Sequence, residues 1–283
     1  MGKYLTNPGF SGGIGQLLLR GENEMECIGL EQQDGVALVR LNRGVINAIN
    51  QSVINELDEV LQVCKHDSAV RGLVLTSNND KFFSIGFDLP ALYPLPREEF
   101  GAFFRAFNLL CLDLFTFPKP IITAITGHAT AGGCILALCA DYRFIAEGRR
   151  LIGVNESKLG VPITHLANLL LRQLLGQRQA REAVSSGTLY PPEEASRIGM
   201  VDGVYSLAKV VSAAIQKARD IGEMPGDGFA ANKRLWVRGI EAQVIPYLEE
   251  EERLFLDQWY APTARRHLKD ALAKFTRDDE SDG

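Results

Sequence analysis

Two features of the sequence could do chemistry together: a carboxylate among apolar residues and a glycine pair at the start of a helix. Glu156 has mainly aliphatic neighbours, and burial among such side chains raises a carboxyl pKa toward the range that suits proton transfer. Gly132 and Gly133 precede an apolar run, where the unpaired N–H groups of a helix start favour an anion. The alternatives are an exposed loop glutamate and a simple strand–helix turn.

The elements that must position these residues alternate between strand and helix. Buried strands are predicted at residues 36–41, 72–76, 121–125 and 142–145. Apolar residues at helical spacing predict helices over 51–66 and 97–117, and a further helix starts near Ala131 or Gly132. This alternation indicates an α/β core with parallel strands.

The strand pattern stops near residue 206. Helices are predicted over 207–221, 229–260 and 263–275, with Pro262 separating the last two. We therefore expect a flexible N-terminal tail over 1–24, an α/β core over 25–206 and a helical C-terminal region over 207–283. The run Glu249–Glu252 is interpreted as a solvated helix face.

Composition argues against several classes of protein. The 283 residues carry 30 Lys and Arg against 35 Asp and Glu, a net charge of −5, and no basic stripe of the kind that nucleic-acid binders show. No run of 18 apolar residues predicts a membrane span. The five cysteines and four histidines lack metal-ligand spacing. We expect no metal, no nucleic-acid partner and no membrane partner.

Three motifs occur in order along the chain: Phe83-Ser84-x-Gly86-x-Asp88-Leu89, Ala131-Gly132-Gly133-Cys134 and Asn155-Glu156-x-x-Leu159-Gly160. Together they resemble the enoyl-CoA hydratase/isomerase (crotonase) superfamily over roughly residues 27–220, and within it the Δ3,Δ2-enoyl-CoA isomerases. The resemblance implies a ββα spiral core, with stacked turns of strand and helix. It also implies a helical C-terminal region through which the family assembles as trimers or dimers of trimers.

The resemblance also implies roles for individual residues. The backbone N–H groups of Phe87 and Gly132 would form an oxyanion hole for a thioester enolate, the type of preorganised donor pair that contributes most to such chemistry. Glu156 would be the base. The residues expected to contact the substrate are Ser84, Ile85, Gly86, Asp88, Leu89, Ile46, Ala48 and Ile135. Asp88 is interpreted as the cap of the next helix rather than as an acid.

Ile135 distinguishes the branches of the family. Hydratases resembling this chain carry a second glutamate at that position, whereas moving a double bond from C3 to C2 needs one base and an oxyanion hole. An apolar Ile135 also excludes water. We therefore favour an isomerase with Glu156 as its single base. The alternatives are a hydratase or other crotonase-type lyase or hydrolase, with His165 or Asp113 supplying the missing group, and a non-catalytic acyl-CoA-binding protein.

Three further expectations concern the substrate and its surroundings. Ile46 and Ala48 would hold the CoA adenine by backbone contact, and Arg43 is either a phosphate contact or a surface arginine. The aromatic residues of 97–117 either wall an acyl pocket or pack in the core; they are Phe100, Phe103, Phe104 and Phe107. No cofactor is expected beyond the CoA of the substrate. The expected location is the cytoplasm, with an organelle matrix as the alternative.

Overall fold

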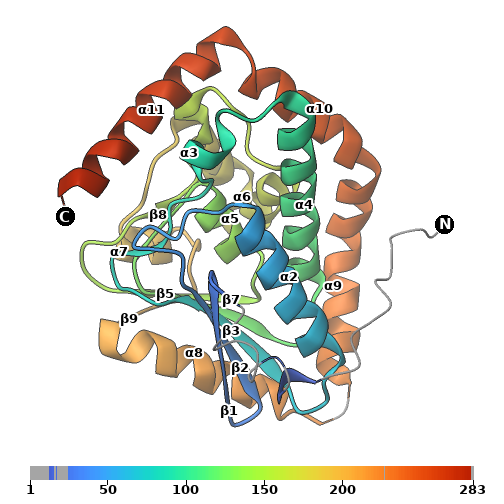
Figure 1. Ribbon diagram of the computed structural model, residues 1–283. Helices are drawn as coiled ribbons and strands as arrows, with labels where there is room; N and C mark the ends of the chain where they lie inside the picture. Colours follow the sequence, from blue (N-terminus) through green and yellow to red (C-terminus); the bar gives the residue numbers. More distant parts are fainter. Residues whose placement is uncertain (1–12, 16, 18–24, 226, 282–283) are drawn as a thin grey trace.

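The computed structural model describes residues 13–15, 17, 25–225 and 227–281 (Figure 1). Its larger sheet has six strands in the order β1-β2-β3-β5-β7-β9, and all neighbours are parallel except the β1/β2 pair. The strands are β1 (Ile28–Gln33), β2 (Val36–Leu41), β3 (Gly72–Ser77), β5 (Ile121–Ile125), β7 (Tyr142–Ala146) and β9 (Gly203–Tyr205). The predicted parallel α/β core is therefore confirmed.

A smaller parallel sheet contains β4 (Phe82–Ser84), β6 (His128–Thr130) and β8 (Ile152–Gly153). Each of its strands follows a strand of the larger sheet along the chain, and a helix follows each in turn. These repeats of two strands and a helix are the expected ββα spiral. The short strands were not predicted, because two or three residues show no measurable hydrophobic period.

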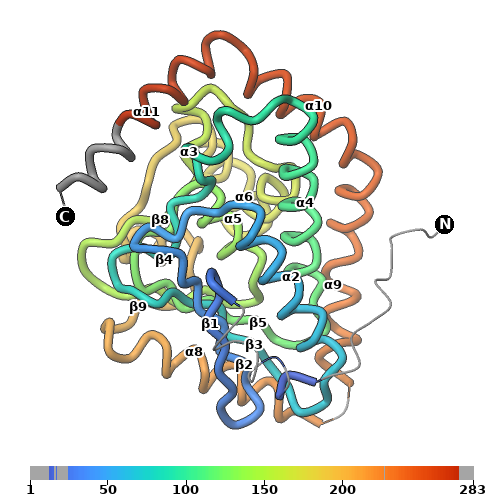
Figure 2. Tube along the Cα trace, in the orientation of Figure 1, coloured from blue at the N-terminus to red at the C-terminus, as the bar shows by residue number. Residues whose placement is uncertain are grey.

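Helices cover the sheets and extend over the top of the molecule, as the Cα trace also shows (Figure 2). In Figure 1, α8 lies below the larger sheet, against which it buries Val210, Ala214 and Ala218. The helices are α2 (Gln51–His66), α3 (Leu89–Leu92), α4 (Arg97–Thr116), α5 (Gly132–Leu138), α6 (His165–Ser186), α7 (Pro192–Arg197), α8 (Leu207–Gly222), α9 (Gly228–Val244), α10 (Leu248–Trp259) and α11 (Pro262–Ser281). Among the described residues no helix has the length and apolar character needed to cross a membrane.

The C-terminal helices share one hydrophobic core with the α/β part. Ile240 and Val244 of α9 and Phe255 and Trp259 of α10 belong to the same buried cluster as strands β2, β3 and β5. The helix predicted over 229–260 is in fact two helices, α9 and α10, with a 3₁₀ turn at Ile245–Tyr247 between them. Pro246 lies in that turn, and its missing N–H explains the break.

Two further expectations need correction. Within the predicted tail 1–24, the described residues Ile14 and Leu17 are buried in the core, and Ile14 N donates a hydrogen bond to Asp67 Oδ2 at 2.7 Å. The rest of that stretch, apart from residues 13 and 15, lies outside the described residues. The acidic run on α10 is only partly solvated, because Glu252 pairs with Arg105 at 2.7 Å and Glu251 binds the backbone of α6.

Candidate active site

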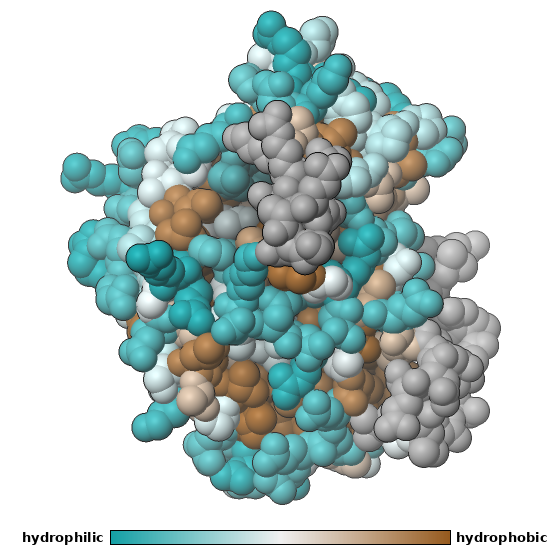
Figure 3. Space-filling model, turned by 60° about the vertical axis from the view of Figure 1, so that its left-hand side comes forward, coloured by the Kyte–Doolittle hydropathy of each residue, from teal (hydrophilic) through white to brown (hydrophobic). Residues whose placement is uncertain are grey.

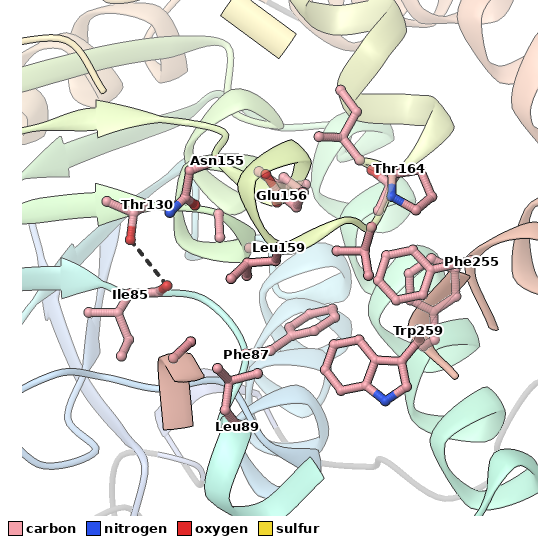
Figure 4. A pocket seen from close by; sticks show the side chains of 18 residues that line it. Ile85, Phe87, Leu89, Thr130, Asn155, Glu156, Leu159, Thr164, Phe255 and Trp259 are labelled. Atoms are coloured by element: carbon pink, nitrogen blue, oxygen red, sulfur yellow. Dashed lines mark hydrogen bonds between the residues drawn. The ribbon is translucent and has the colours of Figure 1, made fainter. Parts of the chain in front are cut away.

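The three sequence motifs meet at the carboxyl ends of the three strands of the smaller sheet. Residues 85–89 follow β4, residues 131–133 follow β6, and Asn155 and Glu156 come soon after β8. Parallel strands place their carboxyl ends at one edge of a sheet, where ligands bind in open α/β folds. A cavity of about 230 Å³ lies there (Figure 4).

The cavity contains some of the predicted site residues and leaves others outside. Those that line it are Ile85, Phe87, Leu89, Gly132, Ile135 and Glu156. Those that do not line it are Ser84, Gly86, Asp88, Ile46 and Ala48. Each member of the second group lies within or beside the segments that hold the first. Their contacts with the substrate, including the adenine contacts of Ile46 and Ala48, stay predictions.

The loop that carries Phe87 approaches the backbone of Gly132 closely because Gly86, the residue before Phe87, has no side chain. Gly86 has φ +96°, and a Cβ at this position would lie 2.8 Å from Gly132 N. Ile49 N donates to Gly86 O at 2.8 Å, and Asp88 N donates to Ile49 O at 2.9 Å. The intervening Phe87 N–H donates to no acceptor among the described residues.

Gly132 begins α5, where the first N–H groups have no acceptor inside the helix. The N–H groups of Phe87 and Gly132 are therefore two neighbouring donors on residues that line the same cavity.

Ser84 and Gly133 hold the segment after β4 in close contact with the start of α5. A Cβ at Gly133 would lie 2.2 Å from the Ser84 carbonyl oxygen, so only glycine permits this contact. Ser84 Oγ donates to Asn47 O at 2.7 Å and accepts from Gly86 N at 3.2 Å. Ser84 Oγ therefore orders the loop after β4, and its contact with the substrate stays a prediction.

Glu156 is the first residue of a 3₁₀ helix, η1 (Glu156–Leu159), and only 7% of its surface is exposed. Burial raises the pKa of its carboxyl from 4.5 to about 7, although the backbone N–H groups of Glu156 and Asn155 act in the opposite direction. Its Oε2 has no hydrogen-bond partner among the described residues. Glu156 is also the only titratable side chain among the described residues that line the cavity.

Asp88 and Arg43 stabilise the first loop from outside the cavity. Asp88 Oδ1 accepts a hydrogen bond from Ala91 N at 3.1 Å, which is the predicted cap of the following helix, α3. Arg43 Nη2 lies 2.6 Å from Asp88 Oδ2, and its Nη1 donates to Ala48 O at 3.0 Å. These bonds engage two of the three guanidinium nitrogens within the protein, while the side chain stays 33% exposed, so a phosphate contact by Arg43 remains an untested alternative.

Aromatic side chains form one wall of the cavity. Of the four phenylalanines on α4, Phe104 lines the cavity while Phe100, Phe103 and Phe107 pack behind it, so the wall and the core interpretations each hold in part. Phe255 and Trp259 of α10 complete the wall, and sequence reasoning missed both. Their spacing of four residues on one helix face was the available signal.

The two residues considered as a second acid or base lie elsewhere. Neither His165 nor Asp113 lines the cavity, and the backbone N–H of His165 binds Glu251. Ile135 stands at the position where the resemblance places the second glutamate of a hydratase. It is 2% exposed and lines the cavity. Among the described residues there is also no group of three or more His, Cys, Asp or Glu able to hold a metal ion.

The fold and this site define the class of protein. The family model for enoyl-CoA hydratase/isomerase matches residues 31–278, and the chain belongs to this family. It is 33% identical over 193 residues to "Enoyl-CoA delta isomerase 1, mitochondrial" of Mus musculus, covering 68% of this chain and 67% of that protein. The Homo sapiens protein of the same name is 28% identical over 223 residues, covering 78% and 74%.

Solved structures agree with this assignment. The human mitochondrial delta3-delta2-enoyl-CoA isomerase superposes with a TM-score of 0.86 at 26% identity, covering 89% of this chain and 99% of that one. An enoyl-CoA hydratase/isomerase from Xanthobacter autotrophicus Py2 gives a TM-score of 0.76 at 29% identity, covering 87% and 96%. The predicted family and fold are confirmed.

Proposed function

We propose that this chain is a Δ3,Δ2-enoyl-CoA isomerase that moves a C=C bond of an acyl-CoA thioester from C3 to C2. One observation carries the proposal: Glu156 is the only titratable side chain among the described residues that line the cavity, whose other side chains are apolar except for Thr130, Asn155 and Thr164. The relatives named as enoyl-CoA delta isomerases support it. The natural setting for this reaction is the degradation of unsaturated fatty acids.

The reaction begins with the thioester carbonyl oxygen between the N–H groups of Phe87 and Gly132. The Glu156 carboxylate removes a proton from C2, and the electron pair moves onto the thioester oxygen, which forms a dienolate. The two N–H donors stabilise this charge as it develops. Protonated Glu156 then returns the proton to C4, which places the double bond between C2 and C3 and regenerates the carboxylate.

The environment of Glu156 suits both halves of this cycle. A pKa of about 7 makes the group a competent base and, once protonated, a competent acid near neutral pH. Ile135 and the aromatic wall exclude water from the dienolate. A hydratase would need a second acid–base group, and no described lining residue supplies one. Burying a carboxylate with an unpartnered oxygen costs free energy, and a protein that only binds its ligand gains nothing from it that would offset this cost.

The test is to incubate the protein separately with 3-hexenoyl-CoA and 2-hexenoyl-CoA while following the absorbance of the conjugated thioester and the product mass. An absorbance rise at unchanged mass with the first substrate, lost in Glu156→Gln, is the expected result. Addition of water to the second substrate without any shift of the double bond would instead establish a hydratase.

We also propose a homotrimer or a hexamer, with no cofactor beyond the CoA of the substrate. Large apolar side chains are exposed on or beside α9, among them Leu235 and Trp236 at 69% and 64%. Figure 3 shows further hydrophobic patches on one face. Exposed apolar surface of this kind marks an interface. Light scattering on the purified chain and on Trp236→Glu tests this, and we expect the variant to shift toward monomer.

The compartment we propose is aqueous, either the cytoplasm or an organelle matrix. The relatives are named as mitochondrial, which favours the matrix. Localisation of a tagged chain in its own cell checks this proposal.

A further inference from the structure

The two ends of the cavity differ in character. In Figure 4, Ile85 and Thr130 lie on one side of Glu156, while Phe255 and Trp259 lie on the other. Thr130 Oγ1 donates to Ile85 O at 3.1 Å, so the first end carries polar groups. The second end is aromatic and belongs to α10 and α4.

The aromatic end is closed by tightly packed rings. Phe255 stacks on Phe104 with their ring centroids 4.0 Å apart, and Trp259 stacks on Phe100 at 4.2 Å with an interplanar angle of 15°. None of these four side chains is more than 4% exposed. Since protein interiors are packed as densely as organic crystals, this wall cannot yield without displacing the rings behind it.

Trp259 is held by packing and not by hydrogen bonding. Its buried Nε1 has no acceptor among the described residues. A buried N–H without an acceptor is a cost that phenylalanine or leucine at this position would avoid. The property that the site uses here is therefore the bulk of the indole.

We propose that Trp259, with Phe255 beside it, ends the acyl pocket and sets an upper limit to the acyl chain length. This inference rests on the proposed function, because the thioester oxygen at Phe87 and Gly132 and carbons C2 to C4 at Glu156 direct later carbons toward the aromatic end. The CoA moiety is far larger than the cavity and would extend out of it at the polar end. Since the rings close this end of the 230 Å³ cavity, acyl carbons beyond the one that reaches Trp259 have no space in it.

The experiment measures two quantities across an acyl series from six to fourteen carbons. Calorimetry gives the Kd of saturated acyl-CoA thioesters, which cannot isomerise, and absorbance gives kcat/KM for the matching 3-enoyl-CoA thioesters. For the native chain we expect affinity and kcat/KM to fall by roughly tenfold or more at one length within this series, because the next carbons would have to displace the packed rings. We call this fall the length break. In Trp259→Leu we expect the length break at chains longer by two or more carbons than in the native chain. In Trp259→Phe we expect a smaller increase in this length.

Leu256→Ala is the matched control. Leu256 is also buried on α10 and does not line the cavity, so its truncation weakens the docking of α10 without enlarging the acyl end. We expect the control to keep the native break. The proposal is overturned if the native chain shows no break, or if Trp259→Leu leaves the break where it is. Length-limited binding of saturated thioesters without isomerisation would refute only the proposed function.

Discussion

The backbone N–H of His165 donates a hydrogen bond to Glu251 Oε1 at 2.7 Å, which joins the start of α6 to α10. Residues 161–164, which line the cavity, lead directly into α6. Glu251 lies one helical turn before Phe255, on the face that carries the aromatic wall. This single bond therefore connects two walls of the cavity.

The first prediction concerns the effect of Glu251 on stability. Burial raises the pKa of its carboxyl from 4.5 to about 7, so between these pH values the folded state binds more protons than the unfolded state. The free energy of unfolding therefore falls as pH rises from 4.5 to 7 and levels off above that. We expect Glu251→Gln, which keeps an acceptor for His165, to gain on the order of 1–2 kcal/mol at pH 8.

Urea denaturation at pH 5 and pH 8 measures this gain. Glu250→Gln is the matched control, because Glu250 is exposed on the same helix, and it should leave the pH dependence as in the native chain. Equal stability of Glu251→Gln and the native chain at pH 8 would show that ionisation of Glu251 carries no cost.

The second prediction separates stability from activity at Glu156. The same linkage applies, because burial raises its pKa to about 7. Glu156→Gln should lower kcat by about 10²–10⁴-fold, the usual range for loss of a general base. The variant should also be more stable than the native chain at pH 8 by on the order of 1–3 kcal/mol. A variant that loses activity and unfolds more easily would contradict this picture.

The third prediction is the pH profile of the reaction. Glu156 must start as a carboxylate to accept the C2 proton. With a folded pKa of about 7, kcat/KM should rise with pH through the neutral range, reach half its plateau near pH 7 and stay level above. Stopped-flow or steady-state assays between pH 5 and 9 give this profile. A half-point near pH 4.5 would indicate that the free enzyme solvates this carboxylate.

The fourth prediction tests the spacing of the two N–H donors. Gly86→Ala places a Cβ against Gly132 N, at 2.8 Å in the native geometry, and so pushes the donors apart. We expect a loss of about 10²–10³-fold in kcat, the range seen when an oxyanion donor is removed. Gly176→Ala is the control, since Gly176 has a similar positive φ of 73° but no atom within 4 Å of its Cβ position.

Both variants bear the backbone strain of a positive φ, on the order of 1–3 kcal/mol. Comparable thermal destabilisation with a kcat loss only in Gly86→Ala supports the role of the spacing. If both variants lost kcat equally, the loss in Gly86→Ala would result from backbone strain and not from the spacing of the donors.

Local patterns in the sequence were sufficient for several features. The buried strands β2, β3, β5 and β7 were predicted from apolar runs, and the cap formed by Asp88 was predicted from its place before a helical segment. Helix starts and caps depend on contacts within a few residues. The break at Pro246 was also readable from a local rule, although the single predicted helix overlooked it.

The sequence by itself determined the family, the order of the three motifs and the identity of the one glutamate among them. Only the tertiary structure decided that Glu156 is buried, that the Phe87 and Gly132 backbones are adjacent, and that Phe255 and Trp259 close the cavity. Phe255 and Trp259 lie about a hundred residues from Glu156 along the chain. The burial of a carboxyl, and therefore its pKa, depends on all the groups that surround it in space. The local spacing of residues does not tell which distant segments will surround it.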